Sequence, residues 1–300
     1  MDRLLYWLAQ ALLWGLQRLS LPTVARWGRA GGALVYGLDA RHRRVARENI
    51  QRVFQSEKSP QEMRQLAREN FRRIGENFAC AARTALMDTR QIEPHLDLPA
   101  PEKMQAVLDH TRGRGCVVAL GHFGNFELFA RLRLPGFRHA STYRGLRQPG
   151  LNRLLQSLRE RSGCQFFDRR TEAPALRAAM SRDRVMLGLL VDQHAGDHGL
   201  PVPFFGIACS TSVAPAVFAL RYHCPLYTAV CYRTGLARWR IELGDAIPTH
   251  AQGTPRSTFD IMRDVNQAFE MAIRRDPANW FWVHRRWKLN SQRAVRPPHE

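Results

Sequence analysis

The sequence predicts an α/β fold, a mixed and mostly parallel sheet flanked by helices, with an N-terminal membrane-associated helix. Three observations predict it. Strand-like and helix-like segments alternate along most of the chain, as in a sheet covered by helices. The run Cys-Val-Val-Ala-Leu at 116–120 is apolar throughout and indicates a buried strand. The 300 residues suffice for one large α/β domain plus an N-terminal appendage.

The first segment, Leu4 to Leu21, is apolar but contains Gln10, Gln17 and Arg18. Its uncharged stretch between Arg3 and Arg18 is 14 residues long, whereas a full span needs about 20. Flanking arginines could extend it by snorkelling. A core helix, an in-plane helix and a span therefore all remain open, and a signal peptide is disfavoured because no small-residue cleavage site follows.

Other features favour the membrane. Trp7, Trp14 and Trp27 suit a helix at the interface, where indoles prefer to lie. Arginines at 41, 43, 44, 47 and 52 follow and suit an anionic cytoplasmic leaflet. We expect a membrane-anchoring segment at 1–38, a catalytic domain at 39–290 on the cytoplasmic side, and a basic tail at 291–300.

The catalytic domain is expected to begin with two amphipathic helices and a Pro-containing connector, at 39–53, 60–86 and 94–101. Further helices are expected at 102–112, 126–133, 150–162, 172–181, 212–223 and 255–275. Strands are expected at 116–120, 138–143, 164–167, 185–191, 225–233 and 237–244. Pro277 ends the last helix, and a tryptophan-rich block follows it.

Composition limits the function classes. The formal net charge of +19 predicts an anionic partner: membrane lipid, phosphorylated glycolipid, acidic carrier protein or nucleic acid. The six cysteines are scattered without a Cys-x-x-Cys pair, which indicates buried thiols and neither a disulfide framework nor a zinc site. The nucleotide-binding P-loop, the dinucleotide fingerprint, the zinc-protease motif and the serine-hydrolase elbow are all missing from the sequence. We expect no metal and no cofactor.

The chemistry is expected at the turn after strand 116–120, which reads Gly-His-Phe-Gly-Asn-Phe-Glu. The glycines allow a sharp turn and close approach of a ligand. Glu127 falls in the first turn of the next predicted helix, where negative charge is favoured, and is expected to hold the ring of His122. A carboxylate-backed imidazole can take a proton from an attacking hydroxyl. A His and a Glu at this spacing can also be ordinary surface or core residues.

This motif resembles the acyltransferase motif of the bacterial lipid A late acyltransferases, membrane enzymes that add secondary acyl chains to Kdo-lipid A. The resemblance covers roughly residues 1 to 290 in ordered blocks. The further blocks are Asp192-Gln193, Val-Pro-Phe-Phe-Gly at 202–206, the segment with Thr211 and Pro215, and Trp-Phe-Trp-Val-His-Arg-Arg-Trp-Lys at 280–288.

The resemblance implies transfer of a fatty acyl chain from an acyl carrier protein thioester to a hydroxyl of the lipid A precursor. It implies His122 as the general base with Glu127, at the cytoplasmic face of the bacterial inner membrane. Substrate contacts are implied for Asn125, Arg144, Arg159, Arg161, Asp192, Arg285 and Arg286. The developing oxyanion needs fixed donors, for which backbone N–H groups near Gly124 and Asn125, or an arginine, are candidates.

Each of these assignments has an alternative. Arg159 and Arg161 also fit a solvated helix face, and Arg285 and Arg286 could brace the core beside the tryptophans instead of clamping phosphate. Cys116 is expected to be core rather than an acyl-enzyme nucleophile. An enzyme acting on another glycolipid or a lysophospholipid, with acyl-CoA as donor, stays open. A non-enzymatic basic binder ranks last because no nucleic-acid-binding signature appears, and no nucleic-acid partner is expected.

Overall fold

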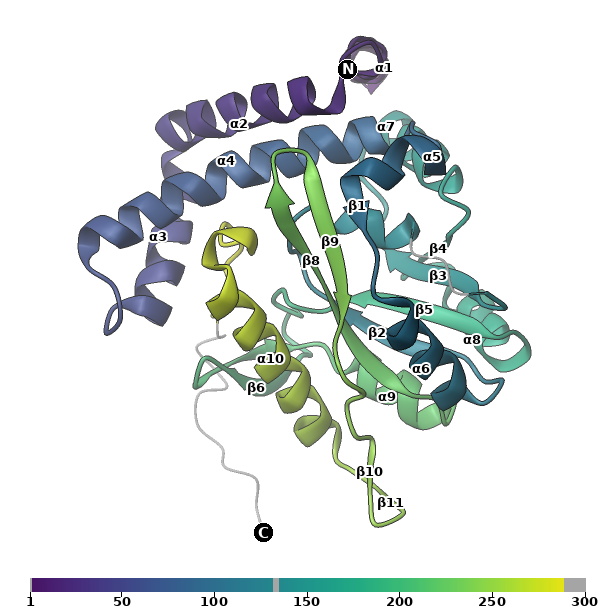
Figure 1. The fold of residues 1–300 in the computed structure, drawn as a ribbon. Helices are drawn as coiled ribbons and strands as arrows, with labels where there is room; N and C mark the ends of the chain where they lie inside the picture. Colours follow the sequence, from purple (N-terminus) through teal and green to yellow (C-terminus); the bar gives the residue numbers. More distant parts are fainter. Residues whose placement is uncertain (1, 132–134, 289–300) are drawn as a thin grey trace.

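A seven-stranded sheet forms the centre of the computed structural model, which describes residues 2–131 and 135–288 (Figure 1). The strand order is β1-β9-β8-β2-β5-β3-β4, and the only antiparallel neighbours in it are β8 and β9. The predicted α/β class with a mostly parallel sheet is therefore confirmed. The tail predicted at 291–300 lies outside the described residues.

The strands of this sheet are β1 (Leu96–Asp97), β2 (Cys116–Leu120), β3 (Arg138–Tyr143), β4 (Gln165–Asp168), β5 (Val185–Leu190), β8 (Leu226–Gly235) and β9 (Arg238–Leu243). Two hairpins stand apart from it, β6 (Leu200–Phe204) with β7 (Ile207–Thr211), and β10 (His250–Ala251) with β11 (Thr254–Pro255). The helices are α1 (Asp2–Gln17), α2 (Leu21–Leu38), α3 (Ala40–Phe54), α4 (Pro60–Thr84), α5 (Thr89–Ile92), α6 (Pro101–Thr111), α7 (Pro149–Glu160), α8 (Ala173–Arg182), α9 (Ala214–Arg221) and α10 (Thr258–Arg275). Three short 3₁₀ helices complete the described elements, η1 (Glu93–His95), η2 (Phe126–Arg131) and η3 (Pro277–Asn279).

Strand β2 lies in the middle of the sheet, parallel to β5 on one side and to β8 on the other. All five of its residues are buried, as expected for a strand covered on both faces. Because β2 and β5 are parallel and in register from Cys116↔Met186 to Leu120↔Leu190, their carboxyl ends meet at one edge. The segments that follow these two strands are therefore brought together. Each contains a polar side chain, His122 after β2 and Asp192 after β5.

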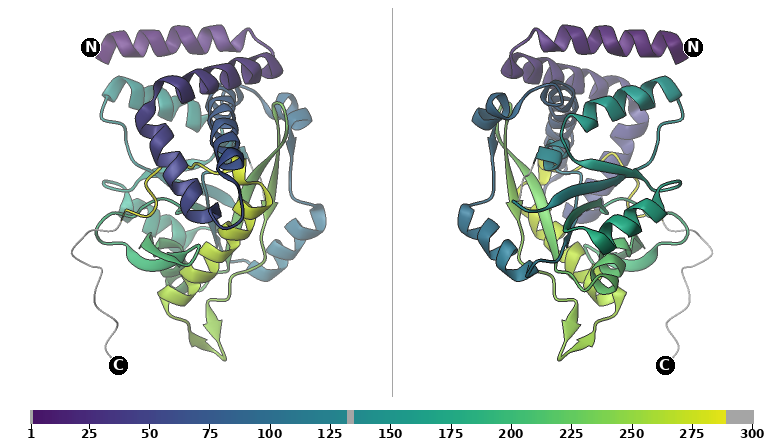
Figure 2. Two further views of the ribbon diagram at one scale, coloured as in Figure 1. Left: turned by 90° about the vertical axis from the view of Figure 1, so that its left-hand side faces the viewer. Right: turned by 90° about the vertical axis from the view of Figure 1, so that its right-hand side faces the viewer.

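Two helices, and not one, form the N-terminal segment. The apolar stretch expected at 4–21 is interrupted because Ser20 caps a second helix, accepting the backbone N–H of Thr23, and Pro22 occupies its first turn. Both helices lie together at one side of the molecule (Figure 2). Among the described residues, no helix is both long and apolar enough to cross a bilayer.

Large apolar side chains are concentrated on the outside of these two helices. They include Trp7, Leu8, Leu12 and Trp14 on α1, each at least 58% exposed. On α2 they include Trp27, which is 66% exposed, and the exposed residues Leu34, Val35 and Leu38. The opposite side of α1 packs against α7 and α4. The two helices thus present an apolar face to solvent that we call the α1–α2 apolar face.

Helix α2 packs closely along α4, the long helix that begins with a capping box formed by Ser59 and Glu62. Three glycines allow this approach. A Cβ at Gly28 or Gly32 would collide with the backbone of α4, and one at Gly75 would collide with the backbone of α2. Glu76 is fully buried beside this contact and accepts hydrogen bonds from Arg29, Arg233 and the backbone N–H of Ala237.

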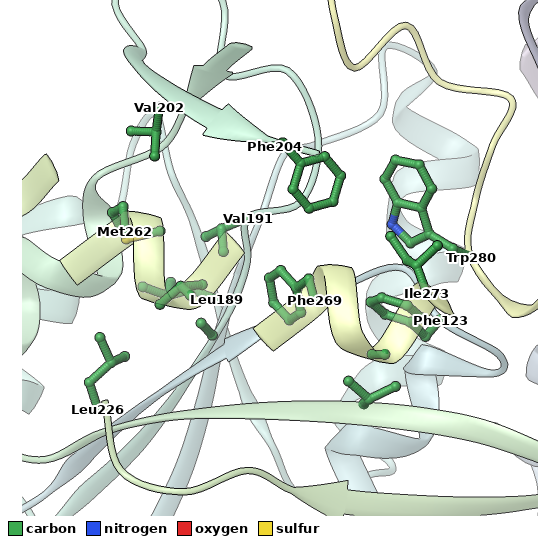
Figure 3. Packing of buried hydrophobic residues seen from close by; sticks show 14 of the residues in the cluster. Phe123, Leu189, Val191, Val202, Phe204, Leu226, Met262, Phe269, Ile273 and Trp280 are labelled. Carbon is green, nitrogen blue, oxygen red and sulfur yellow. The ribbon is translucent and has the colours of Figure 1, made fainter. Parts of the chain in front are cut away.

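The tryptophan-rich C-terminal block is fixed by two asparagines from the helices beside it. Asn70 of α4 donates to the carbonyls of Ala278 and Trp280, and Asn49 of α3 donates to those of Trp282 and His284. Trp280 itself belongs to the main core, where Phe123, Phe204, Phe269 and Ile273 lie near it (Figure 3). The block therefore connects the amphipathic helices to the edge of the sheet.

Candidate active site

The motif turn leaves β2 and is held in place by the C-terminal block. Gly124 has a φ of +52°, a conformation that strains residues with a side chain, and its N–H donates to the carbonyl of Asn279 at 3.1 Å. A Cβ at Gly124 would also collide with the carbonyl oxygen of Cys231. Glycine is thus required here by both conformation and space. The short 3₁₀ helix η2 follows, in place of the α-helix expected at 126–133.

His122 is positioned by Asp192, the second residue after β5. The Nδ1 atom of His122 lies 2.7 Å from one carboxylate oxygen of Asp192, and the backbone N–H of His122 donates to the other at 2.7 Å. Trp280 also donates its indole N–H to that second oxygen, at 2.7 Å. One carboxylate therefore fixes the backbone and the ring of the same histidine, and Nε2 is the ring nitrogen left for a substrate.

The Asp192 carboxyl is 1% exposed, so its charge needs compensation. Burial alone would raise its pKa, but the charge of His122 and the hydrogen bonds from His122 and Trp280 outweigh burial and hold the pKa below its usual value. The carboxylate is therefore ionised at neutral pH. It can stabilise positive charge that develops on the imidazole.

Glu127 does not occupy the position expected from the sequence. Its carboxylate forms an ion pair with Arg159, Nη2 to Oε1, at 2.7 Å, while Nδ1 of His122 is taken by Asp192. The expectation that Glu127 holds the ring was wrong, because a carboxylate from the neighbouring parallel strand is closer. Arg159 also stacks over Phe166, 5.0 Å from the ring centroid.

A cavity of about 650 Å³ opens in front of His122. Its walls come from α4, the motif turn, η2, α7 and the C-terminal block. Apolar side chains make up much of the lining, including Phe126, which meets the His122 ring edge-on with centroids 4.8 Å apart, and Phe281, with centroids 6.0 Å apart. Charged side chains lie among them, namely Arg73, Glu127, Arg131, Arg144, Arg159 and Arg169. The site combines an imidazole held by a carboxylate with room for an apolar chain and anionic groups.

A second, smaller chamber of about 60 Å³ lies behind η2, against the sheet. Six residues line both this chamber and the main cavity: Phe126, Glu127, Ala130, Thr142, Arg159 and Leu190. Its remaining wall is mostly apolar and consists of Val118, Leu120, Phe129, His139, Ala140, Ser141, Cys164, Phe166, Met186, Gly188 and Ala229. The two spaces are therefore neighbours, with the Glu127–Arg159 pair at the boundary.

The predicted substrate-contacting arginines are distributed unequally. Arg144 and Arg159 line the main cavity, whereas Arg161 is exposed just after α7 and is absent from the described lining. Arg285 is exposed as well. Arg286 is fully buried and donates to the carbonyl of Ser210 and the hydroxyl of Thr211, so it braces the β7 end and is not placed to clamp a phosphate.

The predicted oxyanion donors are engaged elsewhere. The N–H of Gly124 donates to Asn279, and the N–H of Asn125 is directed at the sulfur of Cys231. The side-chain amide of Asn125 does line the cavity, and its oxygen is buried without a hydrogen-bond partner in the part of the chain described. The amide nitrogen donates to the hydroxyl of Thr84 at 3.5 Å, so the unpaired group is the oxygen, which can only accept a hydrogen bond.

Two further histidines meet beside the cavity: His194, which the sequence did not single out, and His284. His194 lines the cavity and donates its backbone N–H to Nε2 of His284 at 2.9 Å. Burial lowers the pKa of His284 to about 4, so this ring is neutral at physiological pH. Cys116, in contrast, is fully buried in β2, and burial raises the pKa of its thiol, consistent with a core residue.

The comparison with protein families decides the assignment. The family described as "Bacterial lipid A biosynthesis acyltransferase" matches residues 1–289. The chain belongs to this family. The match covers nearly the whole sequence, including the motif turn, Asp192 and the C-terminal block, which the fold brings to one site.

Two characterised members are similar along almost their whole length. The lipid A biosynthesis palmitoleoyltransferase of Escherichia coli (strain K12) is 23% identical over 291 residues, covering 95% of this chain and 91% of the relative. The lipid A biosynthesis acyltransferase of Shigella flexneri gives the same identity and coverage. Membership of the family therefore supports the function of an acyltransferase in lipid A biosynthesis.

Proposed function

We propose that this chain transfers a fatty acyl group from the thioester of acyl carrier protein to a hydroxyl of a Kdo-lipid A precursor, with His122 as general base. The observation that carries this proposal is the geometry of His122. Its Nδ1 is bound by a buried, ionised Asp192, and its ring lines a cavity of about 650 Å³ that also has apolar and cationic side chains in its wall. Such an imidazole can accept a proton at Nε2.

The reaction then needs no cofactor. Nε2 of His122 removes the proton of the acceptor hydroxyl as its oxygen attacks the thioester carbonyl, forming the new C–O bond. The C–S bond breaks, and the thiolate that leaves takes the proton back from the imidazolium. Asp192 stabilises the imidazolium between these steps, and general-base help of this kind is worth roughly 10²–10⁴-fold in rate.

Other residues of the cavity suit the remaining parts of the substrates. The amide oxygen of Asn125 lies in the motif turn and can accept a hydrogen bond, so we assign it to the hydroxyl of the acceptor. Arg144, exposed at the rim, suits a phosphate or carboxylate of the glycolipid. Arg159 neutralises Glu127 between the two chambers, so we assign this pair to shaping the acyl-chain path and not to proton transfer.

We further propose that the α1–α2 apolar face binds the cytoplasmic surface of the inner membrane. Ten of the large apolar side chains exposed in the described residues lie on these two helices: Leu4, Leu5, Trp7, Leu8, Leu12, Trp14, Trp27, Leu34, Val35 and Leu38. Interfacial tryptophan and leucine are typical of helices that lie in the headgroup region. Two more exposed apolar side chains, Phe78 and Leu146, line the cavity itself, which suits entry of a lipid from that surface.

The test is an assay with labelled acyl carrier protein thioester and Kdo-lipid A precursor in mixed micelles. We expect transfer by the wild-type chain and a loss of about 10²–10⁴-fold in His122→Ala with folding retained. Undiminished transfer by His122→Ala would remove this residue from the mechanism. Transfer from acyl-CoA alone, or to a lysophospholipid alone, would contradict the assigned donor or acceptor.

A further inference from the structure

A strongly basic surface lies on the side of the molecule formed by α3 and the C-terminal block. Six exposed cationic side chains compose it: Arg41, Arg44, Arg47, Arg52, Arg285 and Lys288. We call these six residues the α3 basic face. Within the described chain, only Arg44 among the six has an ion-pair partner, Glu48 at 3.7 Å, and both members of that pair are more than half exposed. The charge of this face is therefore largely uncompensated.

The two parts of this face are held side by side by direct contacts. Asn49 of α3 donates to the carbonyl of His284, the residue before Arg285. The guanidinium of Arg52 lies 5.8 Å from the ring centroid of Trp287, the residue before Lys288. A groove of about 340 Å³ runs along the outer side of α3 between Arg43, Arg44 and Arg47. Figure 1 shows α3 on the left-hand side of the molecule, below α2.

The face adjoins one part of the wall of the cavity in front of His122. His194 lines that cavity and is hydrogen-bonded to His284. Lys288 is close enough to contribute to lowering the pKa of His194, after the effect of burial. A partner seated on the α3 basic face would therefore lie next to the His194 part of the cavity wall, whereas Leu146 and α7 form another part of the same wall.

The character of the face distinguishes it from the α1–α2 apolar face. Among the described residues, no large apolar side chain is exposed on α3 or between 282 and 288. A membrane-inserting surface combines arginine with exposed tryptophan or leucine, as α1 and α2 do here. A polar, cationic and grooved surface instead fits an acidic, water-soluble protein, because complementary charge steers and orients such an encounter.

We propose that the α3 basic face is the docking surface for an acidic carrier protein that presents the acyl chain as a thioester on a flexible prosthetic arm. The arm enters the cavity beside His194, while the glycolipid reaches the cavity from the α1–α2 side. This assignment rests on the proposed function, since it names the surface that receives its acyl donor. It separates the two substrates onto two sides of the protein.

The test compares two donors in the double variant Arg44→Glu/Arg47→Glu. One donor is the acylated carrier protein, and the other is the same acyl chain on free pantetheine, which has no protein surface to dock. We expect the KM for the carrier protein to rise about tenfold or more, with kcat/KM for acyl-pantetheine unchanged. Raising the salt concentration should increase the KM of the wild-type chain for the carrier protein toward the KM of the variant. It should leave the reaction with acyl-pantetheine unchanged.

A matched control reverses two charges on the far helix α8, Arg177→Glu/Arg182→Glu, both exposed. This variant should leave both donors unaffected. An equal loss with both donors in Arg44→Glu/Arg47→Glu would overturn the docking assignment, as would an unchanged KM for the carrier protein. Reduced binding to anionic phospholipid vesicles with an unchanged carrier KM would assign the face to the membrane instead. Absence of transfer from either donor by the wild-type chain would contradict the proposed function itself, which is a separable result.

Discussion

Asp192 and His122 are joined by two hydrogen bonds, one to the imidazole ring and one to the backbone of the same residue. This arrangement couples the orientation of the ring to the conformation of the motif turn. The indole N–H of Trp280 donates to the same carboxylate oxygen as the backbone N–H of His122. The C-terminal block therefore also takes part in positioning His122.

Replacing Asp192 by Asn should therefore impair the chemical step more than binding. The amide carries no charge to stabilise the imidazolium and does not enforce the same tautomer, so kcat should fall by about 10²–10⁴-fold. The measurement is a pH profile of kcat for wild type and variant. A profile with an unchanged shape and an unchanged maximum would contradict the role of Asp192.

Glu127→Gln should behave differently, because this carboxylate faces Arg159 and not His122. The pH profile should keep its shape while the KM for the acyl donor changes. Combining Glu127→Gln with Arg159→Gln in a double-mutant cycle should reveal a non-additive effect, since each single change breaks the same ion pair. Additive effects, or an altered pH profile in Glu127→Gln, would return Glu127 to the proton-transfer pathway.

Arg286→Met should destabilise the fold by about 3 kcal/mol, because charged hydrogen bonds to a buried carbonyl and hydroxyl are lost. The adjacent change Arg285→Met, at an exposed side chain, should alter the free energy of unfolding by about 0.5 kcal/mol or less. Denaturant unfolding of both variants checks this contrast. Similar stabilities for the two would contradict the bracing role of Arg286.

Acidification should weaken the fold through His284. Burial holds its pKa near 4 in the folded chain, against 6.5 for the ordinary side chain, so the unfolded chain binds more protons between these values. The resulting stability is fully present above about pH 6.5 and is lost as the pH falls toward 4. The melting temperature should fall less steeply with decreasing pH in His284→Gln than in the wild-type chain. The same decrease in both would refute the assignment.

The small chamber behind η2 should set the longest acyl chain that is accepted. Ala229→Val adds two methyl groups to a space of about 60 Å³ and should reduce transfer of long chains relative to short ones. Met186→Ala, which enlarges the same chamber, should shift the preference toward longer chains. Competition between thioesters of different length measures both variants, and parallel shifts in the two would rule the chamber out as the chain terminus.

Much of the architecture could be predicted because its signals are local. The strands expected at 116–120 and 138–143 match the observed bounds, since each is a short run rich in strand-forming residues. The β6–β7 hairpin was missed, because Pro201 and Pro203 argue against a strand. A two-stranded hairpin separate from the main sheet has outer edges that tolerate them.

The pairing within the site depended on information that is not local. His122 and Asp192 are 70 residues apart, and they meet only because β5 is the sheet neighbour of β2. The strand order cannot be read from either segment alone. The available signal was a carboxylate that closes an apolar strand, and its partner became visible only once that order was known.

The glycine contact between α2 and α4 has a consequence for which hydroxyl can be acylated. Helix α2 forms part of the proposed membrane surface, and α4 lines the cavity with residues between Arg73 and Thr84. Gly28, Gly32 and Gly75 bring the backbones of α2 and α4 into direct contact. The distance between the His122 imidazole and the lipid headgroups is therefore set by the thickness of these two helices. The enzyme would thus select the hydroxyl that it acylates by its distance from the membrane surface. Only a hydroxyl at the same distance from the headgroups as the imidazole of His122 can reach that ring.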